Sequence, residues 1–350
     1  MRRILYALAA LIAIPALWIG GNLLYGTLTD YTPPATEVAV VTNAQEAGPD
    51  SMVTVMIWNI GYAGLGQESD FFYDGGTSMR TTEQNTRKNL DGIIGFLQAN
   101  DSIDLILLQE VDTQAHRSYH LNELAEIRGA LKGTHSATFA TNYKVGFVPV
   151  PYTEPMRDVT AGLVSLSKFG ISESVRHQYP SSFSWPTSIY FLDRCALVQR
   201  IPMADGKQLV VINTHNSAYD DTGELKKAEL DHLRDLLAAE EQAGNAVIVG
   251  GDWNQTPPSI HPEIFNGGTG EPGSNTNLPE ALLPGWHWAY GTIHPTNRSL
   301  KAPYMAGTTP TFLIDLFLLS PKVELMELNT IDMGFAFSDH QPVVIKVKLK

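Results

Sequence analysis

Acidic, amide and imidazole side chains stand at or near the ends of several apolar runs in this sequence, or interrupt them. The residues with this placement are Asn59, Glu110, His215, Asp252, Asn254, Asp315, Asp339 and His340. Carboxylate oxygens bind hard cations such as Mg²⁺, Mn²⁺ or Ca²⁺. Carboxylates and imidazoles also transfer protons. These residue types suit metal-dependent hydrolysis of a phosphate ester, in which a cation neutralises phosphate oxygens and a base activates water.

Taken singly, most of these positions have an ordinary structural explanation. Asn59 and Asp252 have the residue types of turns, and His215 could be a core histidine with satisfied hydrogen bonds. Asp315 is different, because it interrupts the apolar run of residues 312–319. A buried carboxylate is costly unless it is paired, so Asp315 predicts a partner.

The elements that would position these side chains follow from the apolar patterns. Helical spacing predicts helices over residues 82–99, 121–131 and 224–242. Short apolar runs predict strands over residues 53–57, 104–108, 163–167, 195–200, 209–213, 246–249, 312–319 and 343–347. This alternation indicates an α/β domain, and strand ends in such domains meet at one rim where sites form.

The N-terminal region has a distinct composition. After Arg2 and Arg3, residues 4–25 carry no charge, which is long enough for a membrane-spanning helix. The two arginines predict a cytoplasmic N-terminus. We therefore expect a single-pass membrane anchor at 1–26, an extracytoplasmic tether at 27–51 and a catalytic domain at 52–350. The alternative is a cleaved signal peptide, which would make the domain secreted.

The charge balance argues against a nucleic-acid substrate. The chain has 24 basic and 37 acidic residues, a net charge of −13. Such a body does not attract a polyanion through its long-range field. The single cysteine, Cys195, leaves no intrachain disulfide and no cysteine-based zinc site to consider.

Six short motifs occur together in a fixed order between about residue 52 and residue 350. They are Trp58-Asn59-Ile60, Leu108-Gln109-Glu110-Val111, Asn213-Thr214-His215, Gly251-Asp252-Trp253-Asn254, Ile314-Asp315-Leu316 and Ser338-Asp339-His340. This order resembles the endonuclease/exonuclease/phosphatase superfamily, which includes deoxyribonucleases, abasic-site endonucleases, neutral sphingomyelinases and inositol polyphosphate 5-phosphatases. The resemblance implies a four-layer α/β sandwich, with two packed mixed β-sheets flanked by helices.

The resemblance also implies a set of metal ligands. Glu110 would be the main ligand of Mg²⁺, with Mn²⁺ or Ca²⁺ as alternatives, and Asn59 and Asp339 would assist it. Asp252 and Asn254 would position the attacking water and the phosphate. Asp252 is a candidate base, or a ligand of a second metal.

The remaining motif residues would handle protons and charge. His340, oriented by Asp315, would transfer a proton or bind the phosphate, which would explain the buried aspartate. His215 would stabilise the pentacovalent transition state or protonate the leaving oxygen. Members of the superfamily differ in which group is the base, so that role stays open.

Three further residues are candidate substrate contacts outside the six motifs. Arg194 precedes the strand of residues 195–200 and could bind phosphate or form a surface salt bridge. Asn142 and Arg117 are weaker candidates for substrate binding.

Departures from the superfamily patterns reduce the number of candidate substrate classes. Asn254 is followed by Gln255-Thr256, and Asp315 lies between Ile314 and Leu316, unlike the 5-phosphatase motifs. Aromatic residues gather at 182–191 and 284–290, which suits contact with lipid headgroups or ordinary packing.

We therefore predict a phosphodiesterase acting on phospholipid or sphingolipid headgroups at a membrane. The alternatives are an extracytoplasmic non-specific nuclease, a small-molecule phosphatase or a non-catalytic binding module. The oligomeric state is not predicted.

Overall fold

Two β-sheets carry the fold of the computed structural model, which describes residues 2–220, 222–261, 265 and 277–350. Within this part of the chain, one sheet has the strand order β1-β6-β7-β8-β9-β13-β10 and the other has β14-β15-β2-β3-β5-β4, with a small pair β11-β12 beside them. The strands are β1 (Thr36–Val38), β2 (Met52–Asn59), β3 (Leu105–Ala115), β4 (Ser136–Val148), β5 (Arg157–Ser167), β6 (Glu173–Gln178), β7 (Cys195–Pro202), β8 (Gln208–His215), β9 (Ala246–Asp252), β10 (His287–Ala289), β11 (Asn297–Arg298), β12 (Thr311–Phe312), β13 (Asp315–Leu319), β14 (Val323–Thr330) and β15 (Val343–Leu349).

Alternation along the central strands explains why the sheets are buried on both faces. In β2, Val55 and Ile57 point into the core between the sheets, whereas Met56 and Trp58 face the outer helices. Successive side chains of a strand point to opposite faces, so an almost continuous apolar run can fill two cores at once. β8 and β9 show the same alternation on the other side of the central core.

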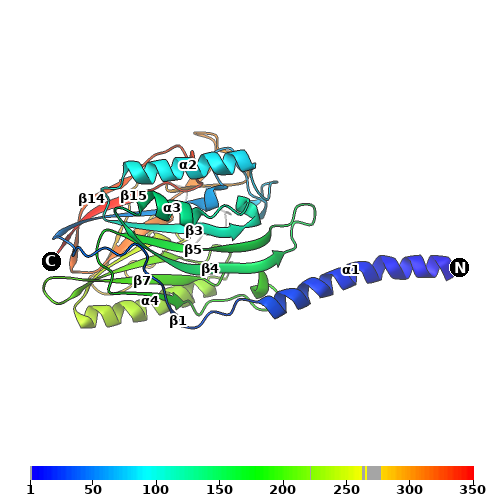
Figure 1. Cartoon of the computed structure of the whole chain (residues 1–350), viewed down its shortest axis with the longest axis horizontal. Coiled ribbons are helices and arrows are strands. Elements are labelled where there is room, and N and C mark those ends of the chain that lie inside the picture. Colours follow the sequence, from blue (N-terminus) through cyan, green and yellow to red (C-terminus); the bar gives the residue numbers. More distant parts are fainter. Residues whose placement is uncertain (1, 221, 262–264, 266–276) are drawn as a thin grey trace.

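The helices complete four layers. The layer helices are α2 (Glu83–Ala99), α3 (Glu123–Leu131) and α4 (Glu224–Ala243), and a further helix, α1 (Arg2–Thr29), lies outside the layers. α2 and α3 cover the sheet that contains β3, and α4 covers the sheet that contains β7 (Figure 1). Thr82 caps α2 by accepting a hydrogen bond from the Asn85 N–H at 3.2 Å. The predicted four-layer sandwich is confirmed.

The strand directions bring the chemical residues to one edge. β2 runs parallel to β3, and β8 runs parallel to β9, so Asn59, His215 and Asp252 end their strands at the same side. β13 is antiparallel to β9 and begins there, with Asp315 opposite Asp252. The single strand predicted for residues 312–319 is wrong, because Phe312 belongs to β12 and the ladder of β13 starts only at Asp315.

At this edge the backbones of β8 and β9 come so close together that one position must be glycine. Gly251 has φ of +153°, and a Cβ atom there would lie 1.9 Å from the Thr214 carbonyl oxygen of β8. Only glycine fits, because a side chain would force the two central parallel strands apart. The Gly-Asp pair thus places Asp252 directly beside the end of β8.

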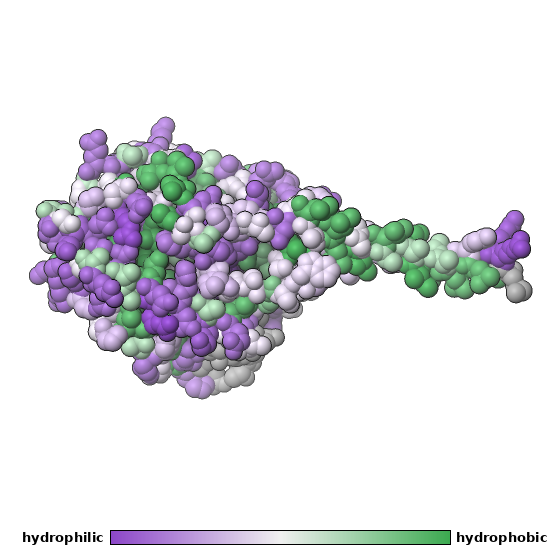
Figure 2. Space-filling view, turned by 90° about the horizontal axis from the view of Figure 1, so that it is seen from below, coloured by the Kyte–Doolittle hydropathy of each residue, from purple (hydrophilic) through white to green (hydrophobic). Residues whose placement is uncertain are grey.

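The N-terminal helix α1 projects from the domain, apolar along most of its length (Figures 1 and 2). Within the described chain it is the helix long and apolar enough to cross a membrane, and signal sequences share these features. Its last turns touch the domain: a Cβ on Gly26 would lie 2.9 Å from Ile189 Cδ1, and Trp185 Nε1 donates to Thr27 Oγ1 at 3.1 Å.

The segment between α1 and the domain is partly built into the sheets. β1 pairs with β6 at the edge of the seven-stranded sheet. A few residues later, Thr42 exchanges backbone hydrogen bonds with Ala137 of β4, the edge strand of the other sheet. Residues 36–42 therefore form a clasp across both sheet edges.

Candidate active site

A buried aspartate and histidine pair forms the centre of the site. Asp315, at the start of β13, accepts a hydrogen bond from His340 Nδ1 through Oδ2 at 2.8 Å. His340 lies just before β15 and is also held through its backbone, whose carbonyl accepts from Trp58 Nε1 at 3.0 Å. The partner that a buried Asp315 predicts is thus His340.

The charge of His340 is set by its surroundings. Burial alone would lower the pKa of His340, but the carboxylates of Asp315, Asp339 and Asp252 raise it well above its ordinary value. Its Nε2 lies 3.7 Å from Asp252 Oδ2 and 3.8 Å from Asp339 Oδ2. The ring is therefore held as a cation among three acids.

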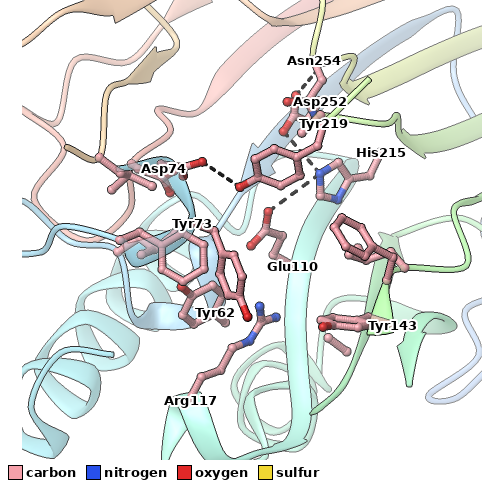
Figure 3. Close-up of a pocket in the computed structure, with 18 of the residues that line it drawn as sticks. Tyr62, Tyr73, Asp74, Glu110, Arg117, Tyr143, His215, Tyr219, Asp252 and Asn254 are labelled. Carbon is pink, nitrogen blue, oxygen red and sulfur yellow. Dashed lines mark hydrogen bonds and ion pairs between the residues drawn. The ribbon is translucent and has the colours of Figure 1, made fainter. Parts of the chain in front are cut away.

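A second group of side chains meets beside this pair. Asn59 Nδ2 donates to Glu110 Oε1 and to Asp252 Oδ2, both at 3.1 Å. His215 Nε2 lies 3.5 Å from Asp252 Oδ2 and 3.7 Å from Glu110 Oε1. Figure 3 shows Glu110, His215 and Asp252 converging from separate strands. Residues far apart in sequence thus share one small volume.

The backbone at Glu110 is strained. Its φ is +55°, uncommon for a residue with a side chain, and the β3–β5 register shifts between Leu108 and Val111. This irregularity interrupts the strand alternation locally and turns the carboxylate toward the cavity. Strain of this kind at a converging polar cluster is typical of functional sites.

The buried carboxylates of the site have raised pKa values. Burial raises the pKa of Asp252 to about 6, although the charge of His340 opposes the shift. Burial also raises the pKa of Asp339 to about 7, again against His340, and Glu110 adds to the rise. Buried acids with raised pKa values gain from a nearby cation, so the donor set fits a divalent metal.

Two neighbouring groups of residues could hold such a metal. Ligand atoms of Asp252, Asp315 and His340 lie within 4.8 Å of one another. In this cluster, however, the Oδ2 of Asp315 is engaged by the His340 ring. The second group has the carboxylates of Glu110, beside His215, and Asp339, beside His340. Asn59 would have to turn its amide to join them, because its Oδ1 accepts from the Gly61 N–H at 3.0 Å.

His215 is held without charge, and Asn254 is held in place by two hydrogen bonds. Burial lowers the pKa of His215 well below its ordinary value, and the charges of Arg194 and His340 add to this, so the ring is neutral. Asn254 has φ of +50°; its N–H donates to Asp252 Oδ1 at 2.9 Å, and its Nδ2 donates to the Asn216 carbonyl at 2.9 Å. Asp252 therefore faces the cluster with its other oxygen, Oδ2, which accepts from Asn59 Nδ2.

The three predicted substrate contacts all line the same cavity, which has a volume of about 420 Å³. Arg194 is buried, and its Nη1 lies 3.5 Å from the His215 carbonyl oxygen. Arg117 pairs with Asp112 at 2.8 Å and stacks 3.7 Å above the Tyr62 ring. Asn142 is buried, and its Nδ2 has no hydrogen-bond partner among the described residues.

Some cavity residues were not predicted from the sequence. Asn297 places Nδ2 2.9 Å from His340 Nε2 and 3.3 Å from the Asp339 carbonyl oxygen. Because the His340 ring is charged, its Nε2 carries a hydrogen, and the Asn297 amide must turn round to present its oxygen as the acceptor. Tyr219 donates to Asp74 Oδ1 at 2.6 Å beside Glu110 (Figure 3). These residues lie in or next to loops whose pattern gives no signal of a shared site.

Comparison with known proteins agrees with this geometry. Residues 56–340 match the model of the Endonuclease/Exonuclease/phosphatase family. The chain belongs to this family. It is a phosphoester hydrolase with a buried aspartate and histidine cluster, and members of the endonuclease/exonuclease/phosphatase family typically use a divalent metal. A comparison with curated protein sequences found no match.

Solved structures share the fold of this endonuclease/exonuclease/phosphatase family member. A family protein from Beutenbergia cavernae is 18% identical, with TM-score 0.59, covering 85% of this chain and 72% of its own. The human Nocturnin catalytic domain with a bound sulfate anion is 17% identical, with TM-score 0.54, covering 89% and 98%. D. rerio TDP2 complexed with single-strand DNA product is 15% identical, with TM-score 0.53, covering 85% and 100%.

Proposed function

We propose that the chain is a divalent-metal-dependent phosphodiesterase that acts on phospholipid or sphingolipid headgroups. Residues 1–26 would anchor it, residues 27–51 would connect the anchor to the domain, and the catalytic domain, 52–350, would lie outside the cytoplasm. The observation that carries the proposal is the contact between the end of α1 and the loops that rim the catalytic cavity.

That contact puts the site next to α1, the proposed anchor. Gly26 of α1 packs on Ile189, and a Cβ on Gly146 would lie 2.5 Å from the Tyr25 hydroxyl. Ile189 lies in a short 3-10 helix, η4 (Ser188–Tyr190), whose flanking residues line the cavity. A domain seated in this way on a membrane helix would hold its cavity close to lipid headgroups. Removal of α1 as a signal peptide would leave these loops without their partner.

The proposed metal ligands are Glu110, Asp339 and Asn59. A bound Mg²⁺, or Mn²⁺ or Ca²⁺ in its place, would neutralise the phosphate oxygens. Glu110 and Asp339 supply the hard oxygen donors that such ions prefer. Asn59 would add its amide oxygen by turning its side chain away from the two carboxylates.

The proposed proton chemistry uses the residues around Asp252. Asp252 Oδ2 would accept a proton from the attacking water, because a carboxylate with a pKa of about 6 is an effective base near neutral pH. The neutral His215 would donate to the developing charge or to the leaving oxygen. His340, held as a cation by Asp315, would bind the phosphate. Asn254 would fix Asp252, and Arg194 would add positive charge to the phosphate site.

One of the two aromatic segments supports lipid contact and the other does not. Trp185 is 59% exposed beside α1. Trp286, in contrast, is buried, and Trp288 packs against Trp253 with ring centroids 4.9 Å apart. The segment 284–290 therefore belongs to the core under α4, and lipid contact is proposed only for the loop that carries Trp185.

A substrate panel tests the proposal. The full-length protein is assayed with Mg²⁺, and again with chelator, on sphingomyelin and glycerophospholipid vesicles, plasmid DNA, RNA and inositol phosphates. We expect chelator-sensitive release of lipid headgroups. Rapid cleavage of plasmid DNA with intact vesicles would instead support the nuclease alternative, and turnover of the inositol phosphates alone would support the small-molecule phosphatase.

A matched pair of variants ties the activity to the site. Glu110→Ala removes a proposed ligand and should reduce metal-dependent turnover to background while the fold persists. Glu241→Ala removes an exposed carboxylate of α4 and should leave turnover unchanged. Equal activity of the two variants would rule out the proposed role of Glu110.

A further inference from the structure

The catalytic cavity has a polar wall and an apolar wall. The polar wall carries Glu110, His215 and Asp252. The other wall is formed mainly by aromatic and aliphatic side chains, among them Tyr73 and Tyr143, with the Arg117 guanidinium stacked on Tyr62 beside them (Figure 3). The apolar wall is one face of a buried hydrophobic cluster that also contains Met156. A phosphate and its metal would occupy only the polar wall.

The tyrosines of the apolar wall present their rings and not their hydroxyls. Tyr73 donates its hydroxyl hydrogen to the Val150 carbonyl at 2.8 Å. Tyr143 donates to the Tyr190 carbonyl at 2.9 Å. With their hydroxyl hydrogens engaged by backbone, these rings offer an apolar surface with little capacity to recognise a polar group. The same bonds fasten the two loops that rim the cavity.

The length of α1 indicates where these loops would lie relative to the bilayer. The Trp18 ring lies 5.4 Å from the Tyr152 ring, an exposed residue of the loop between β4 and β5. Residues 2–17, which precede this contact, measure about 24 Å at 1.5 Å per residue. A hydrocarbon core is about 30 Å thick, so a spanning α1 would bring Tyr152 into the bilayer surface.

We propose that the apolar wall is a subsite for the hydrocarbon chain of the lipid whose phosphodiester is cleaved. This inference rests on the proposed function. The chain would enter from the bilayer between the rim loops and lie along Tyr73, Tyr143 and Met156, while the headgroup phosphate reaches the polar wall. The buried Nδ2 of Asn142, which has no hydrogen-bond partner within the described chain, would donate to the ester or amide carbonyl next to the hydrocarbon.

A nucleobase is the competing occupant of an aromatic wall. Bases stack on such rings, but base recognition also needs polar groups on the wall and positive charge along the approach. Arg117 lines the cavity but is paired with Asp112, and Arg194 lies beside His215 on the polar wall. The hydroxyl hydrogens of Tyr73 and Tyr143 are engaged, and the chain carries a net charge of −13. Position beside α1 and the apolar lining favour the hydrocarbon chain.

Binding of short-chain ligands tests the subsite independently of turnover. The full-length protein, held in an amphipathic polymer without lipid, is titrated calorimetrically with phosphocholine and with butyl-, hexyl- and octylphosphocholine in chelator. We expect affinity to rise about four-fold for each methylene group that enters the cavity. Affinity independent of chain length, or tighter binding of adenosine monophosphate than of octylphosphocholine, would overturn the inference.

Two variants locate the effect on the apolar wall. Leu192 is half-buried and lines the cavity, so Leu192→Asp should lower the ratio of octylphosphocholine to phosphocholine affinity by about tenfold. Leu283 is also half-buried but packs under α4, and Leu283→Asp should leave that ratio unchanged. Ala161→Leu, which fills the cavity with an apolar group, should lower the ratio as well. Equal ratios in all three variants would refute the subsite.

The two proposals can fail separately. If affinity rises with chain length but no lipid is hydrolysed in the substrate panel, the subsite stands and the proposed activity falls. If lipid is hydrolysed and affinity is independent of chain length, the activity stands and the chain subsite falls.

Discussion

Replacing Asp315 by asparagine removes the charge that holds His340 as a cation. The two groups are 2.8 Å apart and buried. At an effective dielectric constant of 20, two unit charges at this distance attract by about 6 kcal/mol. Breaking a buried pair costs about 3–5 kcal/mol, and an amide of the same shape retains part of the hydrogen bonding. We therefore expect Asp315→Asn to lower the free energy of unfolding by about 3 kcal/mol.

The same loss should appear in turnover. If the charged ring contacts the phosphate in the transition state, a loss of about 3 kcal/mol corresponds to roughly a hundredfold fall in kcat. Stability is measured by urea unfolding followed through tryptophan fluorescence. Turnover is measured as the initial rate on a soluble chromogenic phosphodiester with saturating Mg²⁺.

An exposed pair of similar length provides the control. His120 Nε2 and Asp158 Oδ2 are 2.9 Å apart, and both side chains are solvent-exposed. Asp158→Asn should change the free energy of unfolding by less than about 1 kcal/mol and leave kcat unaltered. The reasoning is refuted if the two variants lose equal stability, or if Asp315→Asn keeps kcat within threefold of the wild-type value.

Three further outcomes are expected. Glu110→Ala should bind Mg²⁺ at least tenfold more weakly in calorimetry, since charged ligands dominate such sites, and wild-type affinity would contradict its role. Gly251→Ala should lower the free energy of unfolding in urea by about 3 kcal/mol or more, because the new Cβ would meet a strand carbonyl. Gly95→Ala, at a position in open space on α2, should raise the free energy of unfolding by up to about 1 kcal/mol. Equal free energies of unfolding for the two variants would exclude the steric argument. Gly26→Leu should slow the turnover of vesicle lipid but not the turnover of a soluble diester. Gly20→Leu, at a position with nothing within 4 Å, should slow neither reaction. Equal rates of the two variants on vesicles would argue that the contact between α1 and the domain does not matter for lipid turnover.

Central strands were predictable because they are buried on both faces. β2, β8 and β9 read as apolar runs, and each was expected within a few residues of its observed bounds. Strands at or next to a sheet edge give a weaker signal, since their side chains are partly exposed to solvent. β6 and β14 are rich in charged or polar residues and were missed, although both pair over most of their length.

The site could be predicted only in part, because some of its residues have no distinctive sequence pattern. Asp315 stood out because a charge inside an apolar run demands a partner, and that partner was found in His340. Asn297 and Tyr219 lie at or near loops and reach the site through contacts across the fold. Their residue types are common in loops, so sequence alone could not separate them from solvent-exposed neighbours.

Two segments of similar aromatic composition also differ in their exposure to solvent. The segments 182–191 and 284–290 are both aromatic, yet Trp185 is exposed beside α1 and Trp286 is buried under α4. Exposure depends on which elements pack nearby, and these are far away in sequence.

The clasp of residues 36–42 bears on how the domain can be shortened. β1 covers the outer edge of β6, and Thr42 occupies part of the outer edge of β4. A chain that began at Met52 would leave both edges with unpaired N–H and C=O groups, the arrangement through which sheets of separate molecules join. A truncated protein that retains Thr36 onward should stay monodisperse, whereas one that lacks the clasp should self-associate.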